Sequence, residues 1–293
     1  MTNTRYSFAA DEHLFAEMDE DMSLEANFCA MAICRELSGR ALDGVTEVCP
    51  ANASYQVTYD PDRIAPEKLL GILKEIDEEV GSATQIVADC TIFDVPVLYD
   101  DPWTKECMKQ FRDRHQDPNA TDLEYSARVN DLPSVEAFIG AHSSAPWFVA
   151  GVAFVAGVPF LFQMTPRERQ LEVPKYLRPR TDTPALALGH GGCFSAIYAV
   201  QGAGGYQMLG IIPTPIFDRT QTLPDFKRSM ILLNPGDILR FRPIDRNEYD
   251  SLRAQVDAGT FKYRSNQVQF SLADYLADSD ANNARLVEAL DGD

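Results

Sequence analysis

The sequence predicts an α+β protein in which a small α/β domain precedes a larger, mainly β domain with the character of a barrel. Three observations lead to this prediction. Residues 1–90 follow the order strand, helix, strand, strand, helix, strand. Most later segments are short apolar runs separated by turns. Finally, the glycines between residues 189 and 205 join strand-like segments and do not open a helix.

Composition excludes several classes of function. The 293-residue chain has 44 acidic and 26 basic residues, a formal net charge of −18, which disfavours binding to nucleic acid or anionic membranes. None of its six cysteines has the spacing of a metal site. No apolar segment reaches membrane-spanning length, and the N-terminus lacks a signal-peptide core. We therefore expect a cytoplasmic protein with reduced thiols, no metal, and no nucleic-acid or membrane partner.

The first predicted domain fills residues 1–90. Residues 6–18 alternate like a strand, and Ser23 then marks the start of a helix that runs to Gly39. Strands follow over residues 45–50 and 54–59, and Pro66 opens a second helix with regularly spaced leucines. This order of elements is typical of a ferredoxin-like domain.

The second predicted domain spans residues 91–275. Strands are expected at 93–99, twice within 147–162, at 194–200, 206–212, 230–233 and 238–242. Residues 101–141 are polar and helix-prone, one helix runs from Ser134 to about His142, and another covers 245–256. Residues 276–293 form an acidic C-terminal tail or helix.

The glycine-rich stretch from Gly189 to Gly205 needs a physical reason, because glycine loses more backbone entropy on folding than any other residue. Two reasons are available, namely turns with positive φ or close approach of the backbone to a ligand. A dinucleotide fingerprint is excluded because no helix follows, and a phosphate-binding P-loop is excluded because no Gly-Lys-Ser/Thr follows.

A series of motifs surrounds this stretch. In order, the chain carries His142-Ser143-Ser144, Gly157-Val158-Pro159-Phe160-Leu161, Arg178-Pro179-Arg180-Thr181, Gly191-Gly192-Cys193-Phe194-Ser195-Ala196-Ile197-Tyr198, Gly204-Gly205-Tyr206, Ile216-Phe217-Asp218 and Pro235-Gly236-Asp237. Over residues 10–250 this series resembles the allophanate hydrolase subunit 1 family. That family includes the PxpB component of bacterial 5-oxoprolinase, the kinase inhibitor KipI and the carboxyltransferase part of urea carboxylase.

The resemblance implies a ferredoxin-like domain followed by a cyclophilin-like β-barrel. It also implies one subunit of a heteromeric enzyme that acts on an amide, lactam or related carbonyl. ATP or biotin would be carried by a partner, and the partner would be a homologous second subunit of the allophanate hydrolase subunit 2 type. The alternative is a non-catalytic, KipI-like protein that inhibits a partner such as a kinase. The motifs are compatible with both functions.

The motifs also supply candidate catalytic residues, each with a structural alternative. His142 is either a proton carrier on the pocket wall or a packed histidine. Arg180 either binds a carboxylate or phosphate through a forked contact or is a solvated surface arginine. The amides of Gly191 and Gly192 either hold an anion or a carbonyl oxygen, or belong to a barrel turn.

The remaining candidates are substrate-binding residues at the end of the glycine motif, namely Cys193, Phe194, Ser195 and Tyr198. The alternatives are that Cys193 is a small buried hydrophobe and that Phe194 and Tyr198 are core residues. The family carries Asn-Gln where this chain has Cys193-Phe194. A carboxamide pair suits the polar groups of urea or a lactam, so its loss predicts a less polar substrate, or a site that has been lost.

Overall fold

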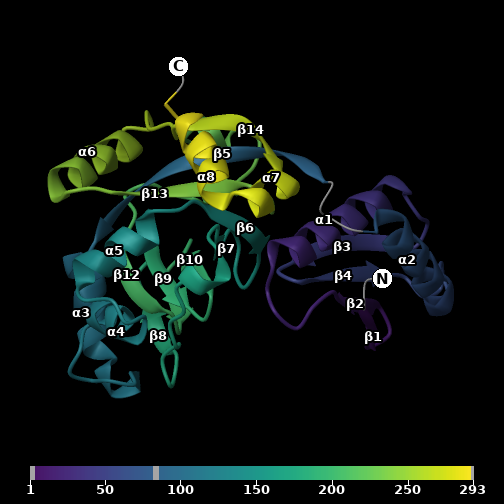
Figure 1. Cartoon of the computed structure of the whole chain (residues 1–293), viewed down its shortest axis with the longest axis horizontal. Coiled ribbons are helices and arrows are strands. Elements are labelled where there is room, and N and C mark those ends of the chain that lie inside the picture. Colours follow the sequence, from purple (N-terminus) through teal and green to yellow (C-terminus); the bar gives the residue numbers. More distant parts are fainter. Residues whose placement is uncertain (1–3, 82–85, 292–293) are drawn as a thin grey trace. The chain divides into compact units, whose positions relative to one another are not determined.

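The computed structural model in Figure 1 describes residues 4–81 and 86–291. Its backbone separates into two compact units. Unit 1 comprises Met1–Ala88 with Gln269–Ala277, and unit 2 comprises Asp89–Val268 with Asp278–Asp293. The sequence had assigned residues 91–275 to one domain, but residues 269–277 group with unit 1. The reason is apolar packing, since the Phe270 side chain is fully buried with its ring centroid 5.2 Å from that of Phe28.

Unit 1 is a four-stranded antiparallel sheet that packs against two helices. Its elements are β1 (Arg5–Ala9), β2 (His13–Glu17), α1 (Leu24–Gly39), β3 (Val45–Ala51), β4 (Ser54–Tyr59), α2 (Pro66–Val80) and α7 (Leu272–Ala277). Alternate residues of β2 and β4, such as Leu14 and Val57, join apolar residues of both helices in one core. The predicted helix start is confirmed, since the Ser23 side chain accepts a hydrogen bond from the amide of Ala26.

The N-terminal sheet departs from the expected strand order. Residues 6–18 form two strands, β1 and β2, because Ala10 adopts a positive φ of 54° and turns the chain back. The sheet order is β1-β2-β4-β3, so β1 occupies the edge that the strand after α2 would fill in a ferredoxin-like sheet. The strand after α2 is β5 (Val87–Tyr99), and it pairs in a different sheet.

Unit 2 is built on the larger sheet. Its strands are β5, β6 (Trp147–Val152), β7 (Pro159–Gln163), β8 (Arg180–Thr183), β9 (Ala187–Gly191), β10 (Phe194–Ile197), β11 (Gly202–Gly204), β12 (Gln207–Ile211), β13 (Ile238–Pro243) and the first part of β14 (Ser265–Ser271), whose last three residues group with unit 1. Its α-helices are α3 (Pro102–Gln110), α4 (Asp122–Val129), α5 (Val135–Ser143), α6 (Arg246–Asp257) and α8 (Ser279–Glu288). Short 3₁₀ turns cover Arg112–Arg114, Arg167–Arg169 and Pro224–Phe226.

The larger sheet closes on itself. Its strand order is β12-β9-β10-β7-β6-β13-β5-β14, and β12 pairs in addition with β5. The pairings from β12 round to β5 therefore form a ring, as expected for a barrel. A large apolar cluster forms the core of this unit and includes Trp147, Leu161, Leu209 and Phe241. Strands β8 and β11 form a separate two-stranded ribbon.

One local prediction for unit 2, the strand at residues 230–233, needs correction. Residues 230–233 make only one isolated bridge, between Ile231 and Phe217, because the turn that begins at Asn234 ends the segment. The two strands of the glycine-rich stretch, β10 and β12, are not neighbours, since β9 lies between them. The C-terminal segment is the packed helix α8, and Leu286 within it is fully buried. No helix within the described residues is both long and apolar enough to cross a membrane.

Candidate functional site

Unit 2 contains a cavity of about 460 Å³ beside the glycine-rich stretch. Aromatic and apolar side chains make most of its wall. The lining residues are Phe154, Val158, Phe160, Lys175, Tyr176, Pro179, Ala196, Tyr198, Ala203, Gly204, Gly205 and Tyr206. They come from the β6–β7 hairpin, the loop before β8, the end of β10, and β11 with the residues that follow it. A concave apolar pocket with a few polar groups is the usual form of a small-molecule site.

Tyrosine rings that pack against the backbone require glycine at two positions of this stretch. A Cβ atom at Gly191 would lie 2.4 Å from the Tyr206 ring, and one at Gly204 would lie 2.5 Å from the Tyr198 ring. Gly192 has a φ of 65°, and its amide donates a hydrogen bond to the carbonyl of Val173 at 2.7 Å. That amide is therefore already used within the protein. Of the two backbone amides expected to bind an anion, those of Gly191 and Gly192, the second is thus unable to do so.

Strand β10 divides the predicted substrate-binding residues between two environments. Side chains alternate along a strand, so Phe194, Ala196 and Tyr198 face one side and Ser195 faces the other. Ala196 and Tyr198 line the cavity, while the half-buried Phe194 packs edge-on against cavity residue Phe160 at 6.1 Å between ring centroids. Cys193 is half-buried and is not among the lining residues.

Arg180 is fully buried behind the cavity wall. Its Nη1 donates to the carbonyl of Tyr206 at 2.9 Å, its Nε donates to the hydroxyl of Thr183 at 3.2 Å, and its guanidinium carbon lies 4.5 Å from the centroid of the Tyr176 ring. Its Nη2 has no hydrogen-bond partner. Because Arg180 is buried, the prediction that it is a solvated surface arginine is wrong. The alternative, that it is a functional cation, stays a prediction.

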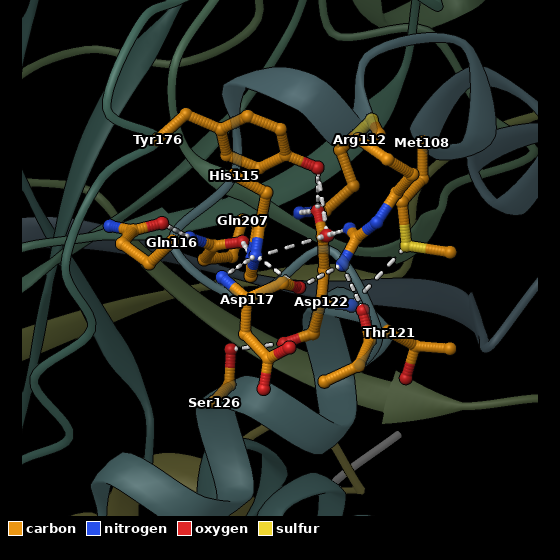
Figure 2. A network of polar contacts seen from close by, with 12 residues as sticks. Met108, Arg112, His115, Gln116, Asp117, Thr121, Asp122, Ser126, Tyr176 and Gln207 are labelled. Carbon is orange, nitrogen blue, oxygen red and sulfur yellow. Dashed lines mark hydrogen bonds and ion pairs between the residues drawn. The ribbon is translucent and has the colours of Figure 1, made fainter.

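Tyr176 connects the cavity to a buried polar network, shown in Figure 2. Its hydroxyl donates to the Asp122 carboxylate, at 2.7 and 2.8 Å from the two oxygens. The same carboxylate accepts hydrogen bonds from Nη1 of Arg112 at 3.0 Å and from the Met208 amide at 2.8 Å. Burial, and then the nearby Asp122 charge, raise the pKa of Tyr176 far above its ordinary value. The Tyr176 hydroxyl therefore stays protonated as a donor.

His115 completes the network beside Tyr176. Its Nε2 lies 2.8 Å from Oε1 of Gln207, and the Gln207 amide nitrogen donates to the carbonyl of Pro174 at 2.8 Å. Because Oε1 can only accept, Nε2 of His115 carries the proton. Burial lowers the pKa of His115 despite the proximity of Asp122, so the neutral imidazole is favoured.

The sequence did not single out these network residues. Thr121 and Glu124 form a capping box at the start of α4, which is a recognisable sequence signal. Nothing in the sequence marks Asp122, Tyr176 or His115, because their contacts join segments that lie far apart in the chain. Lys175 belongs to a basic segment of the sequence, residues 165–180, but its place on the cavity wall could not be predicted.

His142 does not lie on the cavity wall. It is fully buried in the core, where its Nε2 contacts the Ser195 hydroxyl at 3.0 Å and its Nδ1 contacts the Tyr99 hydroxyl at 2.9 Å. Ser195 donates to the carbonyl of Gly189, so His142 donates from Nε2 and accepts at Nδ1. Burial, and then proximity to His190, hold the pKa of His142 well below its ordinary value. The structure thus supports a packed histidine and places Ser195 in the core beside it.

The residues of this region do not form a metal site. Among residues 4–81 and 86–291, no group of three or more His, Cys, Asp or Glu side chains is arranged to hold a metal ion. The polar groups at the cavity are tyrosine hydroxyls, the Lys175 ammonium and the buried Arg180 guanidinium. The two cations can only donate, and donors suit a carbonyl oxygen or an anion, whereas the tyrosine hydroxyls can donate or accept and that of Tyr176 already donates to Asp122.

Comparison with solved structures shows the same fold in a larger protein. The crystal structure of the K. lactis urea amidolyase superposes with a TM-score of 0.86 at 23% sequence identity. The match covers 99% of this chain and 18% of that one. The fold of the whole chain is therefore shared with one segment of that structure.

Sequence comparison gives two kinds of relative. One is the urea amidolyase of Saccharomyces cerevisiae, 25% identical over 98% of this chain but only 16% of its own length. The other is a 5-oxoprolinase subunit of Bacillus subtilis, 24% identical over 84% of this chain and 95% of that protein. The chain thus spans about a sixth of the first relative and nearly all of the second.

The family model described as "Carboxyltransferase domain, subdomain C and D" matches residues 4–226. This range includes the whole cavity wall and the Asp122 network. The resemblance drawn from the motifs of the sequence is thereby confirmed. The chain belongs to the family of carboxyltransferase domains, subdomains C and D.

Proposed function

We propose that the chain is one component of a multi-part enzyme that acts on the carbonyl group of an amide, lactam or urea-like substrate. The observation that carries this proposal is the cavity that adjoins the buried Arg180, within the matched carboxyltransferase range. A preorganised cation beside an apolar pocket can stabilise negative charge that develops on a carbonyl oxygen. In this proposal Arg180 has that role, acting through the wall that Tyr176 and Tyr206 form.

The relatives support the proposal that the enzyme has several components. One relative is named as a subunit, and another contains the matching segment as a small part of a long chain. We therefore expect a second protein component, homologous to this one, to complete the active site. We also propose that units 1 and 2 correspond to the ferredoxin-like and cyclophilin-like domains of the family, and that the protein works in the cytoplasm.

The activating cofactor is expected on that second component. A bound nucleoside triphosphate needs several backbone or cationic donors, whereas the aromatic and apolar wall of this cavity offers one ammonium group. The cavity residues therefore do not suit the triphosphate of ATP. We propose that ATP or carboxybiotin is supplied by the partner and that this chain binds and orients the carbonyl substrate.

The substrate is expected to be less polar than urea. Phe194, which packs against the cavity wall, stands where the family carries a carboxamide. A buried polar group of a ligand that loses its partner costs about 1–3 kcal/mol. A substrate with an apolar face would instead gain from contact with the aromatic wall.

A second candidate function is that of an inhibitory binding protein. One observation favours it, since two large apolar side chains near the cavity, Phe154 and Leu177, are 67% and 71% exposed. Exposed apolar residues beside a pocket can mark a protein-binding face. This alternative requires no chemistry from Arg180.

The test is reconstitution with the product of the neighbouring reading frame. The two proteins are produced together, and ATP-dependent hydrolysis and biotin-dependent carboxylation of a panel of lactams, ureas and more apolar amides are assayed for the complex and for each chain alone. We expect turnover by the complex only. The Arg180→Gln variant should lower kcat by roughly tenfold, less than the loss of a donor that contacts the oxyanion, and the exposed-site control Arg178→Gln should leave kcat unchanged. Turnover by this chain alone, or equal effects of the two variants, would contradict the proposal.

A further inference from the structure

The cavity of unit 2 combines aromatic walls with positive charge that no carboxylate balances. Five aromatic side chains line it, namely Phe154, Phe160, Tyr176, Tyr198 and Tyr206. The ammonium group of Lys175 lies 5.2 Å from the centroid of the Tyr206 ring. Within residues 4–81 and 86–291, no carboxylate forms an ion pair with Lys175 or with Arg180, so the charge beside the cavity is positive.

The chain as a whole carries a net charge of −18, so the positive charge beside the cavity is a local feature. Nearby arginines are neutralised, since Arg112 pairs with Asp122 at 3.0 Å and Arg178 pairs with Asp113 at 3.1 Å. A fully buried guanidinium such as that of Arg180 is costly without a counter-charge. A negatively charged ligand would supply that counter-charge.

The two cations differ in how they can act. Lys175 is exposed and lines the cavity, so its ammonium group can contact a ligand directly. Arg180 has no exposed surface, and its guanidinium stacks behind the Tyr176 ring. It therefore contributes positive potential to the cavity without touching the ligand. In an apolar surrounding that potential is screened less than in water.

The wall also limits which anions fit. A cation would be repelled by Lys175 and Arg180, although tyrosine rings alone would suit one. A phosphate with several charges would need more donors than the single lining ammonium group. What remains is a ligand with one negative charge and an apolar body that contacts aromatic rings.

We propose that the cavity binds carboxylates that carry an apolar or aromatic body, with the body between the tyrosine rings and the carboxylate at Lys175. The inference rests on the proposed function only in assigning substrate binding to this cavity, and it adds the chemical class of the ligand.

Three probes of nearly equal shape test the charge requirement, namely 3-phenylpropanoate, 3-phenylpropanamide and 3-phenylpropylamine. Their binding to the intact chain is measured by calorimetry and by ligand-observed NMR at low and high salt. We expect the carboxylate to bind at least about fivefold more tightly than the amide. We expect the amine to bind most weakly, and the preference for the carboxylate to shrink as salt increases.

Matched variants locate the site. Lys175→Met should remove most of the preference for the carboxylate, whereas Arg178→Met, which deletes a positive charge from the same segment, should not. Ala203→Leu, at an exposed lining position, should weaken the binding of all three probes because the larger side chain narrows the cavity. Equal binding of amide and carboxylate, equal effects of the two charge variants, or no binding of any probe would each overturn this inference. Reconstitution with the partner decides the proposed function separately, because it does not depend on these probes.

Discussion

Burial determines the chemistry of two histidines in the core of unit 2. His190, like His142, is fully buried, and burial lowers its pKa to about 4. Its Nε2 donates to the carbonyls of Leu171 and Gly192 at 3.1 Å, while its Nδ1 has no partner. Both rings are therefore neutral near pH 7. Each must remain neutral for the core to stay packed, which is a structural role.

We expect acid to destabilise the protein through His190. An unfolded histidine titrates near pH 6.5, so the folded state binds fewer protons than the unfolded state between pH 6.5 and about pH 4. The contribution of His190 to the free energy of unfolding is fully present above pH 6.5. It decreases as the pH falls, and at pH 5 it is smaller by about 2 kcal/mol. Urea unfolding at pH 7.5 and pH 5 measures the decrease. His190→Gln keeps a donor near Nε2 and should show a smaller decrease; an unchanged pH dependence would refute the assignment.

At the residue scale, the sequence indicates which polar and charged side chains could act in a site, but not how deeply they are buried or what they contact. The motif containing His142 predicted either a proton carrier on the pocket wall or a packed histidine. The residues that bury it, Tyr99 and Ser195, are 43 and 53 positions away in the chain. The motif series also singled out Arg180, for which a functional role remains a prediction. Its burial could not be foreseen, because it depends on the Tyr176 ring and on the carbonyl of Tyr206.

At the scale of elements, one carboxylate joins three segments of unit 2. Asp122 is the first residue of α4, and it binds the Met208 amide in β12 and the Tyr176 hydroxyl in the loop before β8. Arg112, just after α3, balances its charge. Figure 2 shows the Tyr176 and Arg112 side chains converging on the carboxylate. Asp122 thereby links the segment that contains α3 and α4 to a wall of the cavity.

Removing this carboxylate should therefore destabilise both the segment that contains α3 and α4 and the cavity wall. We expect Asp122→Ala to lower the free energy of unfolding by about 3–5 kcal/mol, because Arg112 and two other donors lose a buried partner. Hydrogen exchange of the α4 amides should accelerate in parallel. Arg178→Gln breaks an ion pair whose side chains are both 68% exposed, and should cost under about 1 kcal/mol. Similar losses in the two variants would show that Asp122 has no special role.

Most helices and strands could be predicted, whereas their pairing could not. Periodicity and caps are local, so α1, α2, α5 and α6 begin within a residue or two of their predicted starts. Sheet order depends on contacts between distant segments. For that reason the position of β1 at the sheet edge, and of β9 between β10 and β12, emerged only in three dimensions.

At the scale of the whole molecule, the excess of acidic residues opposes folding. A net charge of −18 creates repulsion that a compact state increases and that salt screens. We expect 1 M NaCl to raise the free energy of unfolding by roughly 1 kcal/mol relative to 0.05 M NaCl. Urea titrations at both concentrations measure this change. A Glu75→Gln, Glu78→Gln variant, altered at two exposed sites of α2, should gain less from salt; an equal or larger gain would argue against repulsion as the cause.

The pairing of Phe28 with Phe270 in unit 1 has a consequence for biosynthesis. The two rings share one core, yet most of the chain is translated between them. At ribosomal rates of about 5–20 residues per second, Phe28 waits roughly 12 to 48 s for its partner. The nascent N-terminal unit thus emerges before residues 269–277, which carry the partner of Phe28, have been made. During that interval the apolar Phe28 side chain is available to a chaperone or to a neighbouring nascent chain.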